Sequence, residues 1–323
     1  MLAFAIVVAC IGSWEAFWRG HDFIPAVTDD VGLWALARHR ANVHGAESVV
    51  LVGSSRMQMD IQQDAFARAT GWHPVVQLAV VRGPTLPVLE NLANDPKFRG
   101  TVLCEVYPVL FFANTPNIDH MLDEHFRAFE NLSLGRRIEQ QLSMMFQRSF
   151  VTRLPDLSSE RVYKAWGAGR LLRPGYNAFI SDERFRYGDY LKIPNLELHN
   201  RANANLYATT RPKMFNPSEL ARRLRKVGQW VDQIHDRGGQ VIFVHLPAAL
   251  FVLEHEERWW KRENTWDKLA AATNAGMLHY QDYPRLDAFR PPDGIHLGHR
   301  AADIFSGRLG DILVEMSLAP GPD

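Results

Sequence analysis

The sequence predicts an α/β fold built on a parallel, doubly wound sheet of five strands, and three observations support this. Short runs of β-branched and aliphatic residues, bounded by turn residues, are typical of buried strands. Amphipathic segments of helix length separate most of these runs, and strands that alternate with helices form parallel sheets with right-handed crossovers. The chain has 323 residues, 46% of them hydrophobic, which suits one large packed domain.

The first twenty residues are expected to form a membrane segment. Residues 2–12 are apolar throughout, and Trp14, Phe17 and Trp18 follow before Arg19. The apolar run is shorter than the roughly 20 residues that span a bilayer, but Trp and Arg are typical of the interface that closes a membrane segment. No small-x-small cleavage site follows, so an uncleaved anchor is expected. The alternative is a buried first helix of a soluble domain.

The folded domain is expected to occupy residues 21–323. Asp29 and Asp30 are placed to cap a first helix, because acidic residues favour helix N-termini. The next elements follow from apolar β-branched runs and from Gly and Pro punctuation. In chain order they are a strand over 48–53, a helix over 60–70, a strand over 75–81, a helix over 84–94 and a strand over 101–107.

Residues 109–215 interrupt this alternation and are expected to form an insertion that borders the site. Helical pieces are predicted over 121–131, 135–150 and 158–168, followed by a turn-rich region that runs through Pro194 to Asn205. Insertions after sheet strands are where such folds vary their substrates. An independent second domain is the alternative for this segment.

The sheet is then predicted to resume. Leu220, Leu224, Val227 and Val231 recur at three- and four-residue steps, which indicates an amphipathic helix. Five strands connected in this way suit a flavodoxin-like, doubly wound sheet. The remaining elements are a helix over 218–237, a strand over 240–246, a helix over 254–273, a short strand over 278–281 and a closing helix over 298–317.

Two motifs carry the predicted chemistry. Ser55 follows the first strand in the turn Gly53-Ser54-Ser55, and Asp293-Gly-Ile-His296 precedes the last helix. Both turns open at the carboxyl edge of the sheet, where ligands bind in open α/β folds. A serine nucleophile needs a base to accept its proton and an acid to orient that base. The alternatives are a strand-to-helix cap at Ser55 and a helix cap at Asp293.

These two motifs resemble the SGNH/GDSL hydrolase superfamily. Its first block is Gly-x-Ser after strand one, and its last block is Asp-x-x-His. The resemblance implies an SGNH-type fold with Ser55 as nucleophile, Asp293 as acid and His296 as base. Ser54 and Arg56 replace the Asp and Leu of the usual Gly-Asp-Ser-Leu string, a variant similar to the extracytoplasmic branch that includes proteins of teichoic-acid D-alanylation and exopolysaccharide O-acetylation.

The middle blocks of that superfamily are degraded, so the oxyanion hole is inferred from position. Besides the Ser55 N–H, the N–H of Gly83 is expected to serve, since the second block normally supplies a glycine after strand two. The Gly-x-Asn-Asp block has no match, and Asn114 is considered as a replacement for its Asn; a loop turn is the alternative. Arg56 is expected to bind an acyl or saccharide group, or else to pair with Glu105.

Several function classes are disfavoured. Lys+Arg and Asp+Glu both number 36, so no basic excess points to nucleic acid. No glycine-rich phosphate loop occurs, and no cofactor is predicted. Asp293, His296 and His299 have a spacing that could mimic a metal site, but steps of three residues from a turn into a helix converge poorly on one ion. No metal is therefore predicted.

The resemblance and the N-terminal segment together imply a periplasmic or other extracytoplasmic serine esterase or O-acyltransferase, anchored to the inner membrane. Its substrate would be an acylated envelope or extracellular glycan, or a small ester, and a membrane-bound O-acyltransferase is a possible partner. Two alternatives are also consistent with the sequence. One is a noncatalytic protein of the same fold that binds a glycan or that acyltransferase, and the other is a soluble cytoplasmic esterase.

Overall fold

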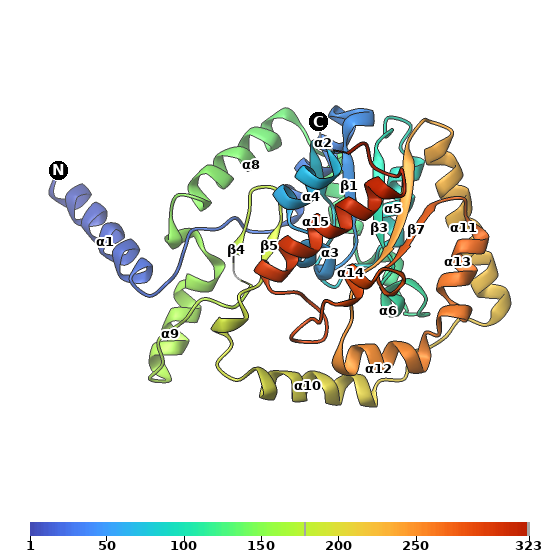
Figure 1. The fold of residues 1–323 in the computed structure, drawn as a ribbon. Coiled ribbons are helices and arrows are strands. Elements are labelled where there is room, and N and C mark those ends of the chain that lie inside the picture. Colours follow the sequence, from blue (N-terminus) through green and yellow to red (C-terminus); the bar gives the residue numbers. More distant parts are fainter. Residues whose placement is uncertain (178, 322–323) are drawn as a thin grey trace.

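A computed structural model describes residues 1–177 and 179–321, and a five-stranded parallel sheet lies at its centre (Figure 1). Along the sheet the strands follow the order β2-β1-β3-β6-β7, and every neighbouring pair is parallel. Taken in chain order, this is the 2-1-3-4-5 arrangement of doubly wound sheets. The predicted parallel sheet is confirmed. Its strands are β1 (Val49–Val52), β2 (Val75–Gln77), β3 (Thr101–Glu105), β6 (Gln240–His245) and β7 (Gly276–His279).

Helices cover both faces of the sheet because its strands are apolar on both sides. Val50 and Val52 of β1 pack into one hydrophobic core, and Val49 and Leu51 pack into another. The first core is covered by α2 (Val31–Val43), α5 (Leu86–Asn94), α11 (Pro217–His235) and α13 (Trp266–Ala272). The second is covered by α3 (Ser55–Asp60), α4 (Gln63–Thr70) and α15 (His299–Glu315).

Two predicted helices differ in extent from those in the structure. The helix expected over 60–70 begins only at Gln63, as α4, since the backbone N–H of Gln62 donates to the Ser306 hydroxyl; α3 before it is a separate helix that was not predicted. The helix expected over 254–273 is divided into α12 (Leu250–Trp259) and α13. Between them the Thr265 hydroxyl donates to the carbonyls of Trp260 and Lys261. Both differences involve hydrogen bonds that hydrophobic periodicity does not encode.

The segment between β3 and α11 contains the three expected helical pieces, and it also contains α6, a β-hairpin and α10, which were not predicted. Asn195 accepts the Leu198 N–H and so starts α10, where a turn-rich region was expected. Asn200 of that helix donates to the Pro292 carbonyl, which draws α10 toward the Asp293 turn. The elements here are α6 (Pro108–Phe111), α7 (Asp123–Glu130), α8 (Leu134–Gln147), α9 (Ser159–Gly167), the hairpin β4 (Phe179–Ile180) with β5 (Arg186–Tyr187), and α10 (Leu196–Thr209).

The N-terminal helix α1 (Leu2–Arg19) projects away from the body of the molecule (Figure 1). Of its residues only Trp18 is buried, so the alternative of a buried first helix is wrong. Its 18 residues are long and apolar enough to cross a membrane by length and composition. The helix is tied to the domain at its C-terminal end, where Glu15 accepts the N–H groups of Val151 and Thr152.

The end of β1 shows why a glycine precedes the two serines. A Cβ atom at Gly53 would lie 2.5 Å from Glu105 Oε2, 2.7 Å from Glu105 Cβ and 2.9 Å from Met57 Cβ. The Glu105 side chain crosses the end of β1 at this point and leaves no space for a side chain at position 53. Glycine is therefore required by close packing between β1 and β3.

Gly53→Ala is expected to lower the free energy of unfolding by about 1–3 kcal/mol, since extra atoms in a packed interior force neighbours to shift. Urea unfolding followed by circular dichroism measures the change. Gly167→Ala on α9 is the matched control, because a Cβ there meets no atom within 4 Å. Equal stability of the two variants would show that the Glu105 contact does not restrict position 53.

Candidate active site

The structure brings Ser55, His296 and Asp293 together although 241 residues separate the first two. His296 Nε2 lies 2.9 Å from Ser55 Oγ, and His296 Nδ1 lies 3.0 Å from Asp293 Oδ2. Both distances are within hydrogen-bond range. Ser55 is the first residue of α3, and the Asp293 turn leads into α15, which packs against α3 and α4. The arrangement is that of a nucleophile, a base and an orienting carboxylate.

Asp293 orients His296 through both carboxylate oxygens. Oδ2 faces the imidazole, while Oδ1 accepts the backbone N–H groups of Ile295 and His296. Gly294 completes the turn with φ +84°, a conformation that favours glycine. Asp293 does not cap α15, whose N-cap is Gly298 without a side-chain bond. The helix-cap alternative is therefore wrong.

Asp293 is held ionised. Burial would raise the pKa of its carboxyl, but the hydrogen bond and charge of His296, together with the two backbone N–H donors, lower it to about 2. The carboxylate can therefore fix the imidazole tautomer and stabilise an imidazolium across the neutral pH range.

Ser55 is free of the capping role that was its alternative. The N-cap of α3 is Ser54, whose hydroxyl accepts the N–H of Arg56 at 3.3 Å. The backbone N–H of Ser54 donates to Glu105 Oε2 at 2.6 Å. The Ser55 side chain is left to face His296, and its own N–H lies in the first turn of α3, where helix N–H groups have no intrahelical acceptor.

Arg56 does not line the cavity that contains Ser55, and its side chain is fully buried. It donates to the carbonyls of Leu246 and Pro247 and lies 3.6 Å from Glu105 and 3.7 Å from Glu256. The expected contact with an acyl or saccharide group is thus not available to Arg56. The alternative, pairing with Glu105, is what the structure shows, because α3 points this side chain into the sheet edge.

The two other oxyanion candidates lie outside the cavity that contains Ser55. The Gly83 N–H donates to the Val80 carbonyl at 2.7 Å, which closes a turn after β2. The Asn114 N–H donates to the Lys213 carbonyl, and the neighbouring Ala113 pairs with Met214. Neither Gly83 nor Asn114 lines the cavity that contains Ser55. Of the three residues expected to donate to the oxyanion, Ser55 is the one that lines the cavity, so its backbone N–H is the remaining candidate.

A cavity of about 930 Å³ opens above the three residues. It lies beyond the carboxyl ends of the neighbouring strands β1 and β3, between which the strand order of a doubly wound sheet reverses and ligands bind. Its size is within the range of small-molecule sites. Its polar lining includes four groups that the sequence did not single out as site residues: Arg82, Asn177, Arg186 and Asn203.

Two further residues near His296 also escaped prediction. Asp60 is fully buried and accepts the Leu297 N–H at 2.8 Å, and Tyr190 donates its hydroxyl to the His296 carbonyl at 3.0 Å. Burial raises the pKa of Asp60 to about 7, against the opposing charges of His296 and Arg56. No local pattern marks either residue, because both reach His296 from distant parts of the chain.

In residues 1–177 and 179–321, no group of three or more His, Cys, Asp or Glu side chains is arranged to hold a metal ion. His299, which follows the Asp293 turn, instead directs Nδ1 toward the Gly188 carbonyl at 3.1 Å.

Comparison with models of known protein families, with curated proteins and with solved structures finds no match to this chain. The geometry of the site is therefore what bears on function.

Asp60→Asn is expected to change how stability depends on pH. Because the folded-state pKa of Asp60 (about 7) lies above its ordinary value of 3.8, the wild type loses stability relative to the variant as pH rises from about 4 to about 7. The loss is at most about 4 kcal/mol, since each pKa unit corresponds to about 1.4 kcal/mol. Urea unfolding of both proteins at pH 4.5, 6.0 and 7.5 measures it. A difference that stays constant with pH would contradict the assignment.

Proposed function

We propose that this protein is an SGNH-like serine esterase or O-acyltransferase, with Ser55 as nucleophile, His296 as base and Asp293 as the orienting acid. The observation that carries the proposal is the 2.9 Å approach of His296 Nε2 to Ser55 Oγ, with Asp293 on the other ring nitrogen. Each of the three groups has the partner that its role requires. The cavity of about 930 Å³ gives a substrate access to Ser55.

The reaction follows from this geometry. Ser55 Oγ attacks the carbonyl carbon of an ester while His296 Nε2 accepts its proton, and Asp293 stabilises the imidazolium. The tetrahedral intermediate collapses, the ester C–O bond breaks, and His296 returns the proton to the departing alcohol. Water or a sugar hydroxyl then attacks the Ser55 acyl ester, with His296 again as base, and Ser55 is released. The Ser55 N–H is the donor placed for the oxyanion.

The membrane setting is the second part of the proposal. We infer that α1 anchors the chain with the folded domain outside the cytoplasm, and that the substrate is an acylated envelope or extracellular glycan. Along α8 a row of apolar side chains is exposed on one side, which gives the domain a second surface suited to lie on lipid; they are Leu134, Ile138, Leu142, Met145 and Phe146. A membrane-bound acyltransferase would be a suitable source of the acyl group.

Labelling of the detergent-solubilised full chain with a fluorophosphonate tests the nucleophile. The wild type is expected to be labelled and Ser55→Ala to be unlabelled, because the reagent bonds to an activated serine oxygen. His296→Ala is expected to slow labelling by about 10²–10⁴-fold through loss of the general base. In-gel fluorescence and intact mass give the rate and the stoichiometry.

Ser54→Ala is the matched control for that experiment. Its hydroxyl caps α3 rather than facing His296, so the variant is expected to keep labelling while losing about 1 kcal/mol of stability. Labelling that survives in Ser55→Ala would exclude this nucleophile. A folded wild type that is neither labelled nor active on aryl acetates would favour a noncatalytic protein that binds a glycan or an acyltransferase.

Deletion of residues 1–12 is expected to release the protein from the membrane fraction, because it removes most of the apolar length of α1 and leaves too little to span a bilayer. Trp18 remains, so its buried contacts with Phe23 and Val151 persist. Carbonate extraction followed by immunoblotting measures the release. Retention equal to that of the full chain would assign membrane attachment to another surface, with α8 as the first to test.

A further inference from the structure

Two cavities follow one another along α1, near the end where that helix joins the folded domain. The first, the α1 groove, has a volume of about 490 Å³ and is lined by Ala9, Cys10, Ser13, Trp14, Phe17 and Trp166. The second, the neck cavity, has a volume of about 450 Å³. Its walls are Gly20, His21 and Asp22 after the end of α1, together with side chains of two later segments that include Arg173 and Lys192. Ser55 lines neither cavity, and the proposed chemistry gives neither a ligand.

One face of α1 lines both spaces. Ala9, Ser13 and Phe17 line the α1 groove, and Gly20 and His21 line the neck cavity. These positions follow one another at steps of three or four residues, so they share one side of the helix. At a rise of about 1.5 Å per residue, the face is about 18 Å long, close to the roughly 15 Å that one leaflet contributes to the hydrocarbon core of a bilayer. An acyl chain of that leaflet therefore has the length to follow this face.

The α1 groove is aromatic along its sides. Trp166 of α9 lies against Trp14 of α1 with the ring centroids 6.5 Å apart, and α9 and the end of α1 lie on the same side of the domain (Figure 1). Trp166 is nevertheless 53% exposed. In the proposed membrane setting Trp14 lies at the interface, so the helix between it and Ala9 lies at the depth of the acyl chains. A bound acyl chain would cover indole surface that the protein itself leaves open.

The neck cavity carries cations that have no partner of opposite charge. Arg173 and Lys192 line it, and in the part of the chain that the structure describes neither forms an ion pair. Asp22 is the carboxylate in its lining. Asp189, close to Lys192 in sequence, caps a short helix by accepting the Leu191 N–H. Two unpaired cations just beyond the end of a membrane helix are suited to the phosphate of a lipid headgroup.

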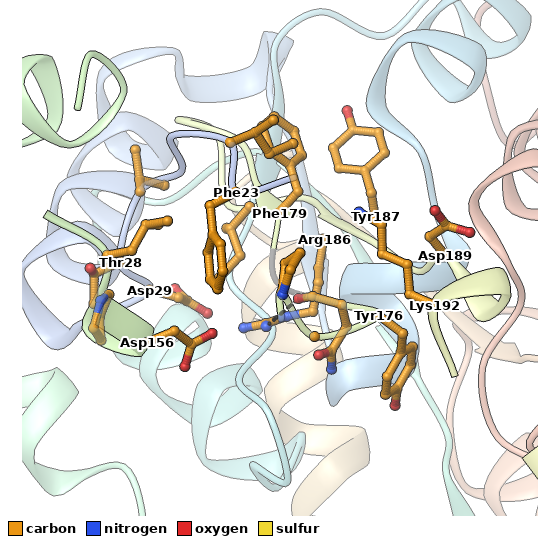
Figure 2. A pocket seen from close by; sticks show the side chains of 18 of the residues that line it. Phe23, Thr28, Asp29, Asp156, Tyr176, Phe179, Arg186, Tyr187, Asp189 and Lys192 are labelled. Carbon is orange, nitrogen blue, oxygen red and sulfur yellow. Dashed lines mark hydrogen bonds between the residues drawn. The ribbon is translucent and has the colours of Figure 1, made fainter. Parts of the chain in front are cut away.

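Apolar side chains accompany these cations. Leu171 and Leu191 line the neck cavity and are 42% and 93% exposed. Lys192 also lines a third cavity, of about 570 Å³, which shares Arg186 with the cavity that contains Ser55 (Figure 2). Exposed leucines beside unpaired cations are typical of a surface at the boundary between headgroups and acyl chains. The neck cavity therefore has the composition that its place after α1 requires.

We propose that this part of the chain binds one anionic phospholipid, with an acyl chain in the α1 groove and the phosphate on Arg173 and Lys192 in the neck cavity. The lipid site rests on the membrane setting of the proposed function but lies apart from Ser55. A zwitterionic headgroup carries an ammonium group of its own, which the two cations would repel, whereas an anionic headgroup brings no such charge. The bound lipid would join α1, α9 and the segment around Lys192 through contacts that the protein alone does not make.

Native mass spectrometry of the full chain in a nonionic detergent tests the proposal. Phosphatidylglycerol and phosphatidylcholine with identical acyl chains are titrated separately and in competition. One phosphatidylglycerol per chain is expected to bind about tenfold or more tightly than phosphatidylcholine. Glycerol 3-phosphate, which has the phosphate without the chains, is expected to bind at least about a hundredfold more weakly than phosphatidylglycerol, because it buries no acyl chain.

Substitutions test each end of the site. Arg173→Gln combined with Lys192→Gln is expected to lower the affinity for phosphatidylglycerol to that for phosphatidylcholine. Arg170→Gln combined with Lys213→Gln is the matched control, since both residues are exposed and line neither cavity; it is expected to keep the preference.

Trp166→Ala is expected to weaken the binding of both phospholipids by about tenfold through lost apolar contact. Tyr163→Ala on the same helix is its control, because Tyr163 is 78% exposed and lies outside both cavities. Thermal unfolding checks that each variant is folded. The comparison of the two phospholipids on the unsubstituted chain decides the matter even if a variant is unstable.

Several outcomes would overturn the lipid site. They are equal affinity for the two phospholipids, a preference that persists in the folded Arg173→Gln, Lys192→Gln protein, and equal loss in Trp166→Ala and Tyr163→Ala. Glycerol 3-phosphate that binds as tightly as phosphatidylglycerol would assign the neck cavity to a soluble phosphate, and a dimer that excludes lipid would assign the α1 groove to a second copy. None of these results depends on Ser55. A preference that requires both cations supports the lipid site even if fluorophosphonate labelling fails, and labelling without any lipid preference leaves the proposed chemistry intact.

Discussion

The buried carboxylate of Glu105 organises the edge of the sheet at which the candidate site is built. It accepts the Ser54 N–H at 2.6 Å, fills the space left by Gly53, and faces the Arg56 guanidinium at 3.6 Å. Arg56 in turn donates to the carbonyls after β6. The ends of β1, β3 and β6 are thereby joined through one ion pair, and the turn that presents Ser55 depends on it. Breaking a buried pair from one side leaves a charge without compensation.

The buried carboxyl groups near the site differ in their pKa values. Arg56 is surrounded by several carboxyl groups, and burial raises the pKa of both Asp60 and Glu256 to about 7. Asp293 alone among these three has a lowered pKa, of about 2, because its partners are His296 and two backbone N–H groups. Carboxyl groups whose environments separate their pKa values can serve different roles. Here all three are buried, but the ionised one adjoins the imidazole, whereas the other two lie near the Arg56 guanidinium.

Segments outside the sheet build most of the binding space. Tyr190 fixes the His296 carbonyl, α10 reaches the turn before Asp293 through Asn200, and the β4–β5 hairpin places Arg186 between two cavities. The sheet and its flanking helices form a rigid scaffold, while the connecting segments form the walls that a substrate would meet. The walls of the cavity and the position of the Asp293–His296 turn therefore both depend on these connecting segments.

The amino-acid sequence by itself determined the parallel sheet, because β-branched runs and amphipathic helices record locally which faces are buried. It also placed Ser55 next to a strand end and Asp293 within reach of His296, since a three-residue step lets a carboxylate bond to the following backbone and ring. Only the tertiary structure decided that Arg56 is buried, that Gly83 and Asn114 lie outside the Ser55 cavity, and that Arg186 adjoins the site. Those outcomes depend on contacts between residues from distant segments, and the hydrophobic periodicity of one segment does not encode such contacts.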